Sequence, residues 1–440
     1  MTVRAGGCSP GRVARSPMLA ASPGFTFADP YVVGLLFFGL AVFAAIGALS
    51  HERDRAFSAS IIYLGLGAVA ALGIQLLGLS WLDPLEDYAV FEKASGLAVV
   101  IALFATGLKL DRELTGPAWT SVGRLLLLAM PLTIAGVALF GTTVMGLSAG
   151  AAIVLGAILA PTDPVLAGDI GVGPPGDEEE REPNFSITGE AGLNDGLAFP
   201  FLFLGILIAG EEGSGWIGEW VLVDVLYRVV VGVAVGVALG YGLAALVVWL
   251  RDRDLLLHAL DGWLAVAGVL TIYGATEVVG AYGFLAAFAG GVAFRRYEHG
   301  HEYNRRVHDG AEMVEKFGEL ALVLLLVSSV TLAGLGEPGL TGWLLVPVLL
   351  LLIRPVSVAL ALTGTRLDRN ERAFVGWFGV RGIGSLYYAA VAIGTGVLSD
   401  GEARIVFWTT AACVIVSITV HGVTSAPLSR RWLPEDQQRD

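Results

Sequence analysis

One stretch of the chain places acidic and amide side chains inside an otherwise apolar run. It extends from Phe185 to Pro200, contains Glu190, Asn194 and Asp195, and continues into a further apolar segment. Read as one helix, it is long enough to cross a bilayer. A charged side chain at the centre of a bilayer costs about 3 kcal/mol. Two carboxylates and an amide so close together therefore need a structural or functional reason.

Helical geometry gathers these polar groups into one sector. Ser186, Glu190 and Asn194 follow each other at intervals of four residues and share a face. Asp195 lies roughly 100° further round the helix. Apolar residues cover the remaining surface, so the polar sector is expected to face protein or water rather than lipid.

A second polar motif interrupts the apolar stretch 149–168. Its residues Pro161, Thr162, Asp163 and Pro164 place two prolines three positions apart. Proline removes a helical hydrogen bond, and the residue before it is disfavoured in the α region. Asp163 followed by Pro164 also has the pattern of a helix N-cap that restarts a second half-helix. The alternative is a proline-kinked packing helix in which Asp163 only caps.

A third motif carries buried positive charge. Glycines flank Arg381 in the segment 377–385, and Arg354 lies inside another apolar stretch. Arginine cannot lose its proton in a protein, so a buried arginine needs a carboxylate. Glu190 is the predicted partner of Arg354. Paired interrupted helices at corresponding places in two halves of a chain indicate the binding site of a transporter.

Composition supports a membrane protein that spans the bilayer many times. Of 440 residues, 55% are hydrophobic and 15% charged, and the mean hydropathy is +0.72. The 59 glycines fit close helix packing in lipid. A net charge of −13 with few lysines argues against nucleic acid or anionic lipid as a partner. Cys8 and Cys413 differ too much in surroundings to predict a disulfide or a metal site, and no cofactor is predicted.

Apolar runs predict about 13 transmembrane helices in an all-α polytopic fold. The runs cover residues 31–50, 58–80, 90–109, 122–143, 149–168, 185–209, 221–250, 257–275, 278–294, 318–334, 342–363, 372–395 and 405–425. Nineteen of the 27 basic residues then fall on one set of alternate loops and six on the other. By the positive-inside rule, the N-terminus is external and the C-terminus cytoplasmic.

The predicted organisation has three parts. Residues 1–29 form a disordered tail, 30–425 the transmembrane domain and 426–440 a short cytoplasmic tail. Within the domain, residues 31–209 and 257–425 are expected to be inverted repeats joined by a linker helix at 221–250. The fifth and twelfth spans, which carry the interruptions, would be counterparts.

Two charged segments fall on predicted cytoplasmic connections. The acidic run 177–180 fits either a solvated loop or a funnel that attracts cations. The segment from His299 to His308 is expected to be a surface helix or loop rather than a metal site, with its histidines either solvated or functional.

Together these motifs resemble the monovalent cation:proton antiporter superfamily, on its electroneutral sodium/proton exchanger branch. The resemblance covers nearly all of residues 30–425. It is carried by Thr162-Asp163-Pro164, Glu190-x-x-x-Asn194-Asp195-Gly196, Leu103-Phe104-x-x-Gly107-Leu108-x-Leu110, Arg354 and Gly379-x-Arg381-Gly382. It implies a homodimer in the cell membrane with crossed half-helices and a core domain that moves against a dimerisation domain.

The resemblance also implies roles for these residues. Asp195 would bind the cation and the proton in turn, and Thr162 would supply further oxygens. Asp163 would neutralise the half-helix ends, and Asn194 marks the electroneutral branch. Glu190 and Arg354 would form a structural ion pair, with Arg381 at the second interruption.

Two departures from the family pattern put the cation's ligand set in question. Ala191 stands where relatives often carry a hydroxyl residue, and Ala105 and Thr106 stand where some carry an acid.

The predicted function is therefore secondary antiport of Na⁺ against H⁺ by alternating access. The sequence leaves Li⁺ or K⁺ open as the cation, and a K⁺/H⁺ antiporter of the same fold is an alternative. A cation channel would need a continuous pore, which interrupted inverted helices disfavour. A membrane sensor is disfavoured because no receiver or catalytic domain is evident. No enzymatic activity is expected, and no metal beyond the transported cation.

Overall fold

The computed structural model describes residues 30–49, 58–78, 81–168, 170–173, 181–210, 213–255, 261–297 and 304–433. These residues form helices joined by turns, with no β-strand among them. The predicted disordered tail 1–29, the acidic run 177–180, His299 and the last residues of the chain lie outside the described residues.

The helices differ widely in length. The first half contains α1 (Pro30–Leu49), α2 (Ala59–Leu76), α3 (Tyr88–Lys109), α4 (Thr120–Arg124), the π-helical segment η2 (Leu125–Ala129), α5 (Met130–Thr143), α6 (Ala149–Leu159), α7 (Pro164–Ala167) and α8 (Glu182–Gly210). The second half contains α9 (Ile217–Glu219), η3 (Trp220–Tyr227), α10 (Arg228–Arg251), α11 (Asp261–Val278), α12 (Gly283–Tyr297), α13 (Asn304–Ser328), α14 (Leu332–Gly336), α15 (Gly339–Val348), η5 (Leu349–Ile353), α16 (Arg354–Ala361), α17 (Arg369–Trp377), α18 (Gly384–Gly394) and α19 (Asp400–Trp432).

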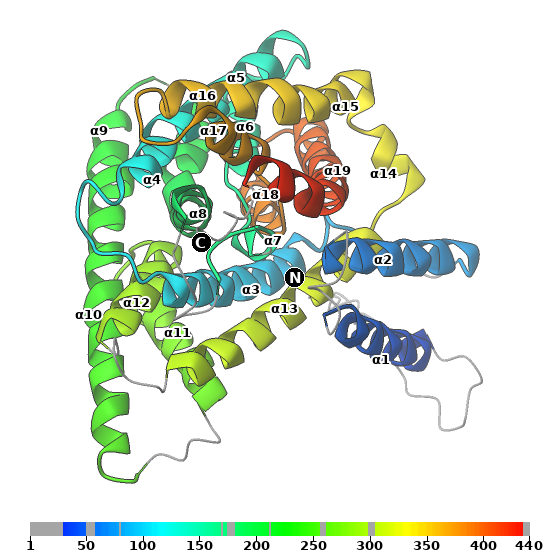
Figure 1. The fold of residues 1–440 in the computed structure, drawn as a ribbon. Coiled ribbons are helices and arrows are strands. Elements are labelled where there is room, and N and C mark those ends of the chain that lie inside the picture. Colours follow the sequence, from blue (N-terminus) through cyan, green and yellow to red (C-terminus); the bar gives the residue numbers. More distant parts are fainter. Residues whose placement is uncertain are drawn as a thin grey trace, which may run out of the picture.

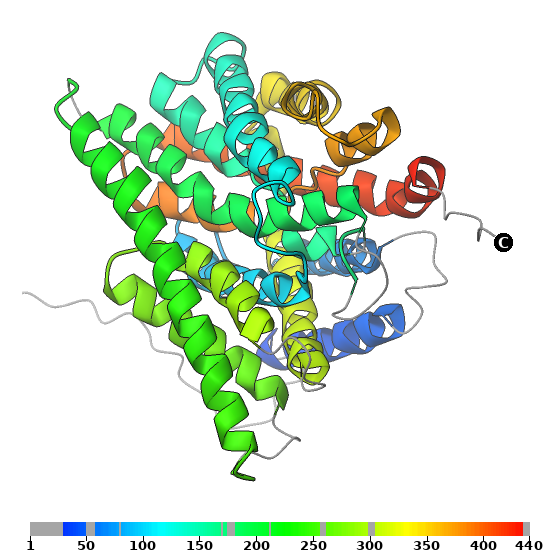
Figure 2. The ribbon, with the colours of Figure 1, turned by 60° about the vertical axis from the view of Figure 1, so that its left-hand side comes forward.

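The helices form one bundle with a short half-helix near its middle. Figure 1 shows α7, α8 and α18 in the centre, with α10 along one edge and α1 and α2 on the opposite side. The view in Figure 2 shows α10 crossing the face of the bundle at an angle. The interrupted elements are therefore surrounded by other helices, which is where broken backbone can be tolerated in a membrane protein.

The all-helical fold predicted from the sequence is confirmed. Each of the predicted apolar stretches overlaps one helix or a series of consecutive helical segments. Among the described residues, eight helical stretches are long and apolar enough to cross a membrane, and three further apolar helices are shorter. The exact number of crossings stays a prediction.

Helix α13 begins well before the apolar run that predicted it. The run starts near residue 318, whereas the helix starts at Asn304. Val307, His308 and Ala311 are buried, with His308 only 1% exposed. The solvated alternative is therefore wrong for His308, whereas the exposed Asp309 beside it fits the predicted surface helix. Average hydropathy misses such a helix, because charged residues on its other faces mask the buried stripe.

Helix α19 continues further than predicted. It runs through Pro427 to Trp432, so the segment expected to be a tail begins as helix. Leu428 and Trp432 pack against a cluster of buried apolar side chains that includes Phe374. This packing offsets the hydrogen bond that proline removes.

The two predicted interruptions are present. Backbone between α6 and α7 leaves the helix at residues 160–163, and backbone between α17 and α18 leaves it at residues 378–383. Pro164 occupies the first position of α7 behind its N-cap Asp163, as the proline spacing predicts. The second interruption contains Gly379 and Gly382 and is followed by Gly384. It has no proline.

A matching distortion links the two halves of the chain. The π-helical segments η2 and η5 both consist of four leucines and one further apolar residue, and Pro131 and Pro355 follow at the same distance. Helix α16 packs on η2 and α5, and α5 also contacts η5. A similar sequence with the same distortion in the fourth and eleventh spans is compatible with two structural repeats, which stay a prediction.

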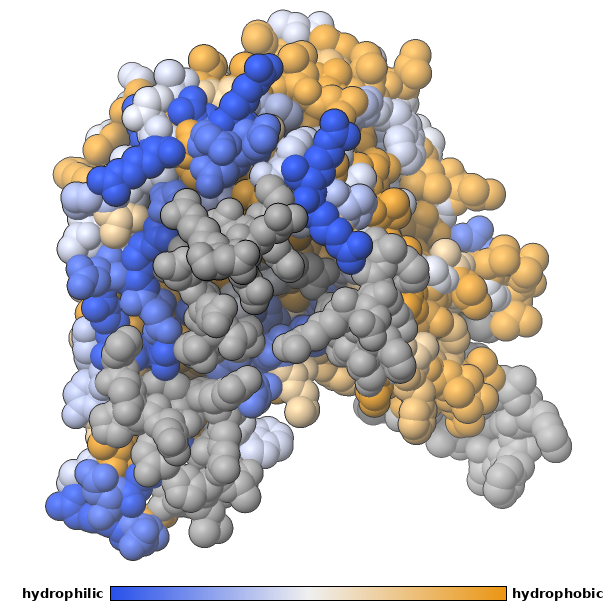
Figure 3. All heavy atoms as spheres, in the orientation of Figure 1, coloured by the Kyte–Doolittle hydropathy of each residue, from blue (hydrophilic) through white to orange (hydrophobic). Residues whose placement is uncertain are grey.

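Apolar side chains cover much of the outer surface. Phe43, Leu76, Leu127, Val278 and Leu340 are each more than 70% exposed. Hydrophobic residues gather over the side formed by α1, α2, α14 and α15 (Figure 3). Exposed apolar area of this extent fits contact with lipid.

The closest packing between helices is built on glycine. Gly232, Gly236 and Gly240 recur at intervals of four residues on α10 and face the backbone of α12. A Cβ atom at Gly236 would lie 2.4 Å from the carbonyl oxygen of Ala286. Small residues at this spacing allow two helix backbones to approach each other in a membrane.

This contact gives a prediction with a matched control on the same helix. Gly236→Ala is expected to destabilise the protein by about 1–3 kcal/mol because the added methyl group overpacks a backbone contact. Gly242 has no atom within 4 Å of its Cβ position, so Gly242→Ala is expected to be neutral or stabilising by up to about 1 kcal/mol. Thermal melting in detergent measures both, and equal melting temperatures would contradict the packing argument.

Candidate cation site

The two interruptions are hydrogen-bonded to each other. The backbone N–H of Asp163 donates to the carbonyl oxygen of Val380 at 2.9 Å. In return, the backbone N–H of Ile383 donates to Oδ2 of Asp163 at 2.8 Å. Residues more than 200 positions apart in the sequence thus meet where both helices are unwound.

Asp163 accepts hydrogen bonds from two half-helix ends at once. Its Oδ1 accepts from the N–H groups of Val165 and Leu166 at 2.8 and 3.1 Å, at the start of α7. Its Oδ2 accepts from Ile383, the N-cap residue of α18. Both half-helices therefore direct unpaired N–H groups at one buried carboxylate, which is favourable for a negative charge.

Only glycine fits beside this carboxylate. A Cβ atom at Gly382 would lie 1.8 Å from Oδ2 of Asp163. Gly382 is one of the glycines that flank Arg381 in the sequence. A larger residue at this position would clash with Asp163.

Asp195 lies on α8 and faces the start of α18. A Cβ atom at Gly384 would lie 3.3 Å from either of its carboxylate oxygens. Asp195 is 2% exposed, and its Oδ2 is buried without a hydrogen-bond partner. The hydroxyl of Tyr388 donates to the backbone carbonyl oxygen of Asp195.

Asn194 and Thr162 connect α8 to the first interruption. The side-chain Nδ2 of Asn194 donates to Oγ1 of Thr162 at 2.8 Å. Its amide oxygen Oδ1 is buried without a partner. Oδ1 of Asn194 and Oδ2 of Asp195 thus belong to adjacent residues and have no hydrogen-bond donor. Hard oxygen atoms of this kind are the ligands that alkali cations prefer.

Glu190 and Arg354 form a buried bidentate ion pair. Nη1 and Nη2 of the arginine donate to the two carboxylate oxygens at 2.5 and 2.6 Å. Both residues are 1% exposed. Paired, parallel hydrogen bonds of this type fix both side chains and neutralise both charges.

Arg381 lies beside this pair at the second interruption. It is fully buried, and its Nη1 donates to the carbonyl oxygen of Gly379, whereas Nε and Nη2 lack a partner. A Cβ atom at Gly379 would lie within 3 Å of both guanidinium groups. The two guanidinium groups therefore lie close together, and it is Arg354 that forms the ion pair with Glu190.

Helix α19 secures the ends of the second interruption. Oγ of Ser417 accepts from the backbone N–H of Arg381 at 2.8 Å. Nε2 of His421 lies 2.9 Å from the carbonyl oxygen of Trp377, the last residue of α17. These contacts satisfy backbone groups that the break leaves without helical partners.

Several of these residues carry no signal in the sequence. Tyr388, Ser417 and His421 look like ordinary members of apolar helices. Ser385 is another, and its hydroxyl donates to the carbonyl oxygen of Ile158 near the end of α6. Only contacts across the fold identify them.

Two cavities flank the crossing. One of about 490 Å³ is lined by Glu92, Glu277, Phe199, Tyr282 and Tyr387, among others. The ring of Phe199 also contacts the ring of Tyr388, with centroids 5.2 Å apart. An aromatic cluster thus stands between this cavity and Asp195.

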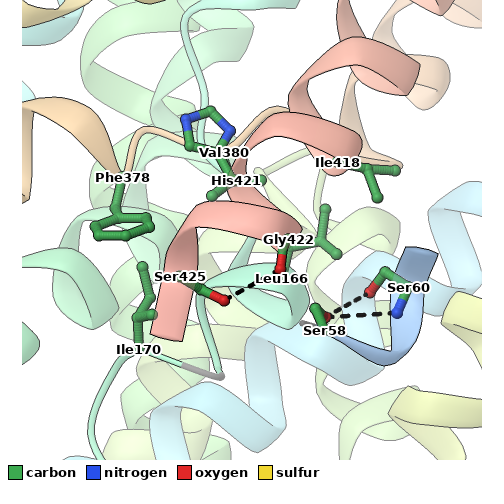
Figure 4. Close-up of a pocket in the computed structure, with 10 residues that line it drawn as sticks. All are labelled: Ser58, Ser60, Leu166, Ile170, Phe378, Val380, Ile418, His421, Gly422 and Ser425. Atoms are coloured by element: carbon green, nitrogen blue, oxygen red, sulfur yellow. Dashed lines mark hydrogen bonds between the residues drawn. The ribbon is translucent and has the colours of Figure 1, made fainter. Parts of the chain in front are cut away.

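The second cavity is much smaller. Figure 4 shows it between Leu166, Val380, His421 and the serines at the start of α2. Its volume is about 10 Å³, close to the space needed for one water molecule. Access to the crossing is therefore wider from the side of Phe199 than from the side of α7.

This combination of crossed half-helices and a buried carboxylate defines a membrane transporter. The family model described as "Sodium/hydrogen exchanger, transmembrane" matches residues 30–431. The chain belongs to this family, which confirms the resemblance.

Relatives and solved structures agree with this assignment. The chain is 26% identical to the Na⁺/H⁺ antiporter of Saccharomyces cerevisiae, over 83% of this chain and 40% of that protein. It is 28% identical to the K⁺/H⁺ antiporter NhaP of Alkalimonas amylolytica, over 91% of this chain and 66% of that protein. The fold matches a structure of the sodium proton antiporter MjNhaP1 from Methanocaldococcus jannaschii with a TM-score of 0.72 at 18% identity, over 93% of this chain and 99% of that chain.

The structure brings Thr162, Asp163, Asn194 and Asp195 together around the crossing, with Glu190 on Arg354. Their roles in binding a cation stay predictions. So does the role of Arg381.

The ion pair itself can be tested by a double-mutant cycle. Glu190→Gln and Arg354→Ala are each expected to cost about 3–5 kcal/mol, because each leaves one buried charge without its partner. The double variant should recover part of the loss. Thermal melting of the three variants measures the coupling, and strictly additive losses would contradict the pairing.

Proposed function

We propose that this protein is a secondary antiporter that exchanges Na⁺ for H⁺ across the cell membrane. The observation that carries the proposal is the Asp195 carboxylate, which is buried at the crossing with one oxygen free of hydrogen bonds. Membership of the sodium/hydrogen exchanger family supports it. The chain spans about two fifths of the length of the yeast antiporters that it matches. Their activity is therefore only proposed for this chain.

The mechanism rests on competition for one carboxylate. A buried carboxylate is stabilised either by a bound cation or by a proton, and each removes the charge that the other needs. Asp195 therefore binds Na⁺ or H⁺ but not both. Oδ1 of Asn194 and the oxygen atoms near Thr162 are the further proposed ligands.

Alternating access completes the cycle. The proposal is that the core helices around the crossing move against the remaining helices, so that Asp195 faces one cavity and then the other. The large cavity beside Phe199 and the small one beside α7 fit a state that is nearly closed on the α7 side. A carrier of this kind forms no covalent bond, so no enzymatic activity is proposed.

Asp195→Asn is expected to abolish exchange while leaving the fold intact, because the amide takes up no proton and offers no negative charge to Na⁺. Its melting temperature should equal or exceed that of the wild type, since a costly buried charge is removed. Dye-monitored ΔpH dissipation in everted vesicles measures the activity with NaCl, LiCl and KCl in turn. Asp400→Asn, at an exposed position in the first turn of α19, is the control and should retain activity. Exchange near the wild-type rate in Asp195→Asn would exclude this mechanism.

The exchange is proposed to be electroneutral, with one cation per proton. Asn194 carries an amide that does not titrate, and Glu190 is neutralised by Arg354. Asp163 is already held by N–H groups from both half-helices. Asp195 is then the one carboxylate left to exchange its ligand.

Voltage dependence tests this stoichiometry. Moving one extra charge would couple the cycle to the membrane potential by about 2.3 kcal/mol per 100 mV. In proteoliposomes with a fixed Na⁺ gradient and a potassium–valinomycin potential, the rate is expected to be independent of voltage, provided that K⁺ is not a substrate. A rate that changes several-fold with voltage would mean that a second charge moves.

K⁺/H⁺ exchange is the second candidate. The observation that favours it is the similarity to the K⁺/H⁺ antiporter of A. amylolytica over most of this chain. The salt series in everted vesicles separates the two, because ΔpH dissipation by KCl but not NaCl would select K⁺.

The setting of the protein is also a proposal. The distribution of basic residues supports an external N-terminus and a cytoplasmic C-terminus. The family resemblance supports a homodimer. The exposed apolar surface in Figure 3 leaves room for both lipid and a second copy.

A further inference from the structure

Helix α13 presents a row of titratable side chains to the interior of the bundle. His308, Glu312, Glu315 and Glu319 follow one another at intervals of four, three and four residues and therefore share one face. This helix packs against α2, α3 and α7. The row thus approaches the half-helix that begins at Asp163.

Glu315 differs from Glu312 and Glu319 in having one buried carboxylate oxygen without a hydrogen-bond partner. Glu312 is about one-third exposed and forms an ion pair with Lys316 at 3.4 Å. Glu319 accepts a hydrogen bond from the hydroxyl of Ser60. Glu315 is 3% exposed, and its Oε2 is buried without a hydrogen bond. A buried carboxylate oxygen without a donor is an acceptor available to a cation or a water molecule.

The position of Glu315 places it beside the crossing. Helix α13, which carries Glu315, contacts α7, and Asp163 is the N-cap of α7. Lys109, at the end of α3, attracts Glu315, and its Nζ would lie 3.9 Å from a Cβ atom at Gly168 directly after α7. Glu315 therefore lies on the α7 side of the crossing, opposite the large cavity beside Phe199.

The small cavity lies between the interruptions and Ser60, a residue of α2 that also contacts α13. Ser58 and Ser60 line it together with Leu166 and Val380 (Figure 4). The hydroxyl of Ser60 also donates to Glu319, one turn from Glu315. The positive-inside pattern assigns this side of the molecule to the cytoplasm.

We propose that Glu315 is a second alkali-cation site, on the cytoplasmic approach to the crossing, which holds the cation before it reaches Asp195. The inference rests on the proposed antiport. A carboxylate oxygen without a donor attracts a cation, and the nearby ammonium group of Lys109 limits the affinity. Such a site is strong enough to concentrate the ion and weak enough to release it, as conduction through successive sites requires.

Sided kinetics test this site. Everted and right-side-out vesicles expose opposite faces of the protein to added NaCl. Glu315→Gln is expected to raise the apparent KM for Na⁺ at the cytoplasmic face by about tenfold, since the proposed ligand carboxylate is lost. The KM at the opposite face and the maximal rate should be unchanged. Lys109→Met should lower the cytoplasmic KM.

Glu312→Gln is the matched control, because it removes a carboxylate one turn away that already has Lys316 as its partner. It should leave both KM values unchanged. A rise in KM of equal size at both faces, or no rise at either, would overturn the proposal for Glu315.

A binding measurement separates this proposal from the antiport mechanism. If wild-type vesicles show no cation-dependent proton flux, the proposed function fails by itself. Calorimetric titration of purified Asp195→Asn with NaCl should then still detect weak binding, and adding Glu315→Gln should remove it. Equal binding with and without Glu315→Gln would exclude the second site, including where the vesicle assay gives no signal.

Discussion

The rest of the structure depends on a single carboxylate that joins two interrupted helices. Asp163 caps α7 through one oxygen and holds the N–H of Ile383 at the start of α18 through the other. Unwound backbone in a membrane protein is costly unless its polar groups find partners. The crossing supplies them from within the protein, and it leaves the start of α18 facing Asp195. The site exists because two helix breaks satisfy each other.

Charge balance around the crossing explains why so many ionisable groups are buried there. Arg354 and Glu190 neutralise each other, Asp163 is held by half-helix N–H groups, and Arg381 adds a positive charge close by. Glu190, Arg354 and Asp163 each have their charge compensated by a fixed neighbour or by oriented backbone N–H groups. Asp195 has one carboxylate oxygen without such a partner, and in the proposed mechanism a mobile ion compensates its charge. This difference in compensation, more than burial itself, is the reason for proposing Asp195 rather than Asp163 or Glu190 as the transport carboxylate.

The surroundings suggest how an ion could approach from either side. The cavity beside Phe199 is wide and carries Glu92 and Glu277, whereas the cavity beside α7 holds about one water molecule. The row of glutamates on α13 reaches the narrow side. An exchanger needs both routes but never both open at once. The aromatic cluster on one side and the narrow, mainly apolar cavity on the other fit that requirement of the proposed mechanism.

The sequence by itself determined the helical membrane fold, the two interruptions and the residues that cluster around them. It did so because bilayer thickness sets the length of apolar runs and proline breaks helices. In addition, a charged side chain inside the membrane is costly, so it marks a pairing or a functional site. It also indicated Glu190 as the partner of Arg354. It could not reveal the buried face of α13, because average hydropathy hides a stripe of apolar residues among charged ones. The tertiary structure alone decided that His308 and Glu315 are buried and that Tyr388 touches Asp195. Such contacts join residues distant in the chain, and local sequence carries no record of them.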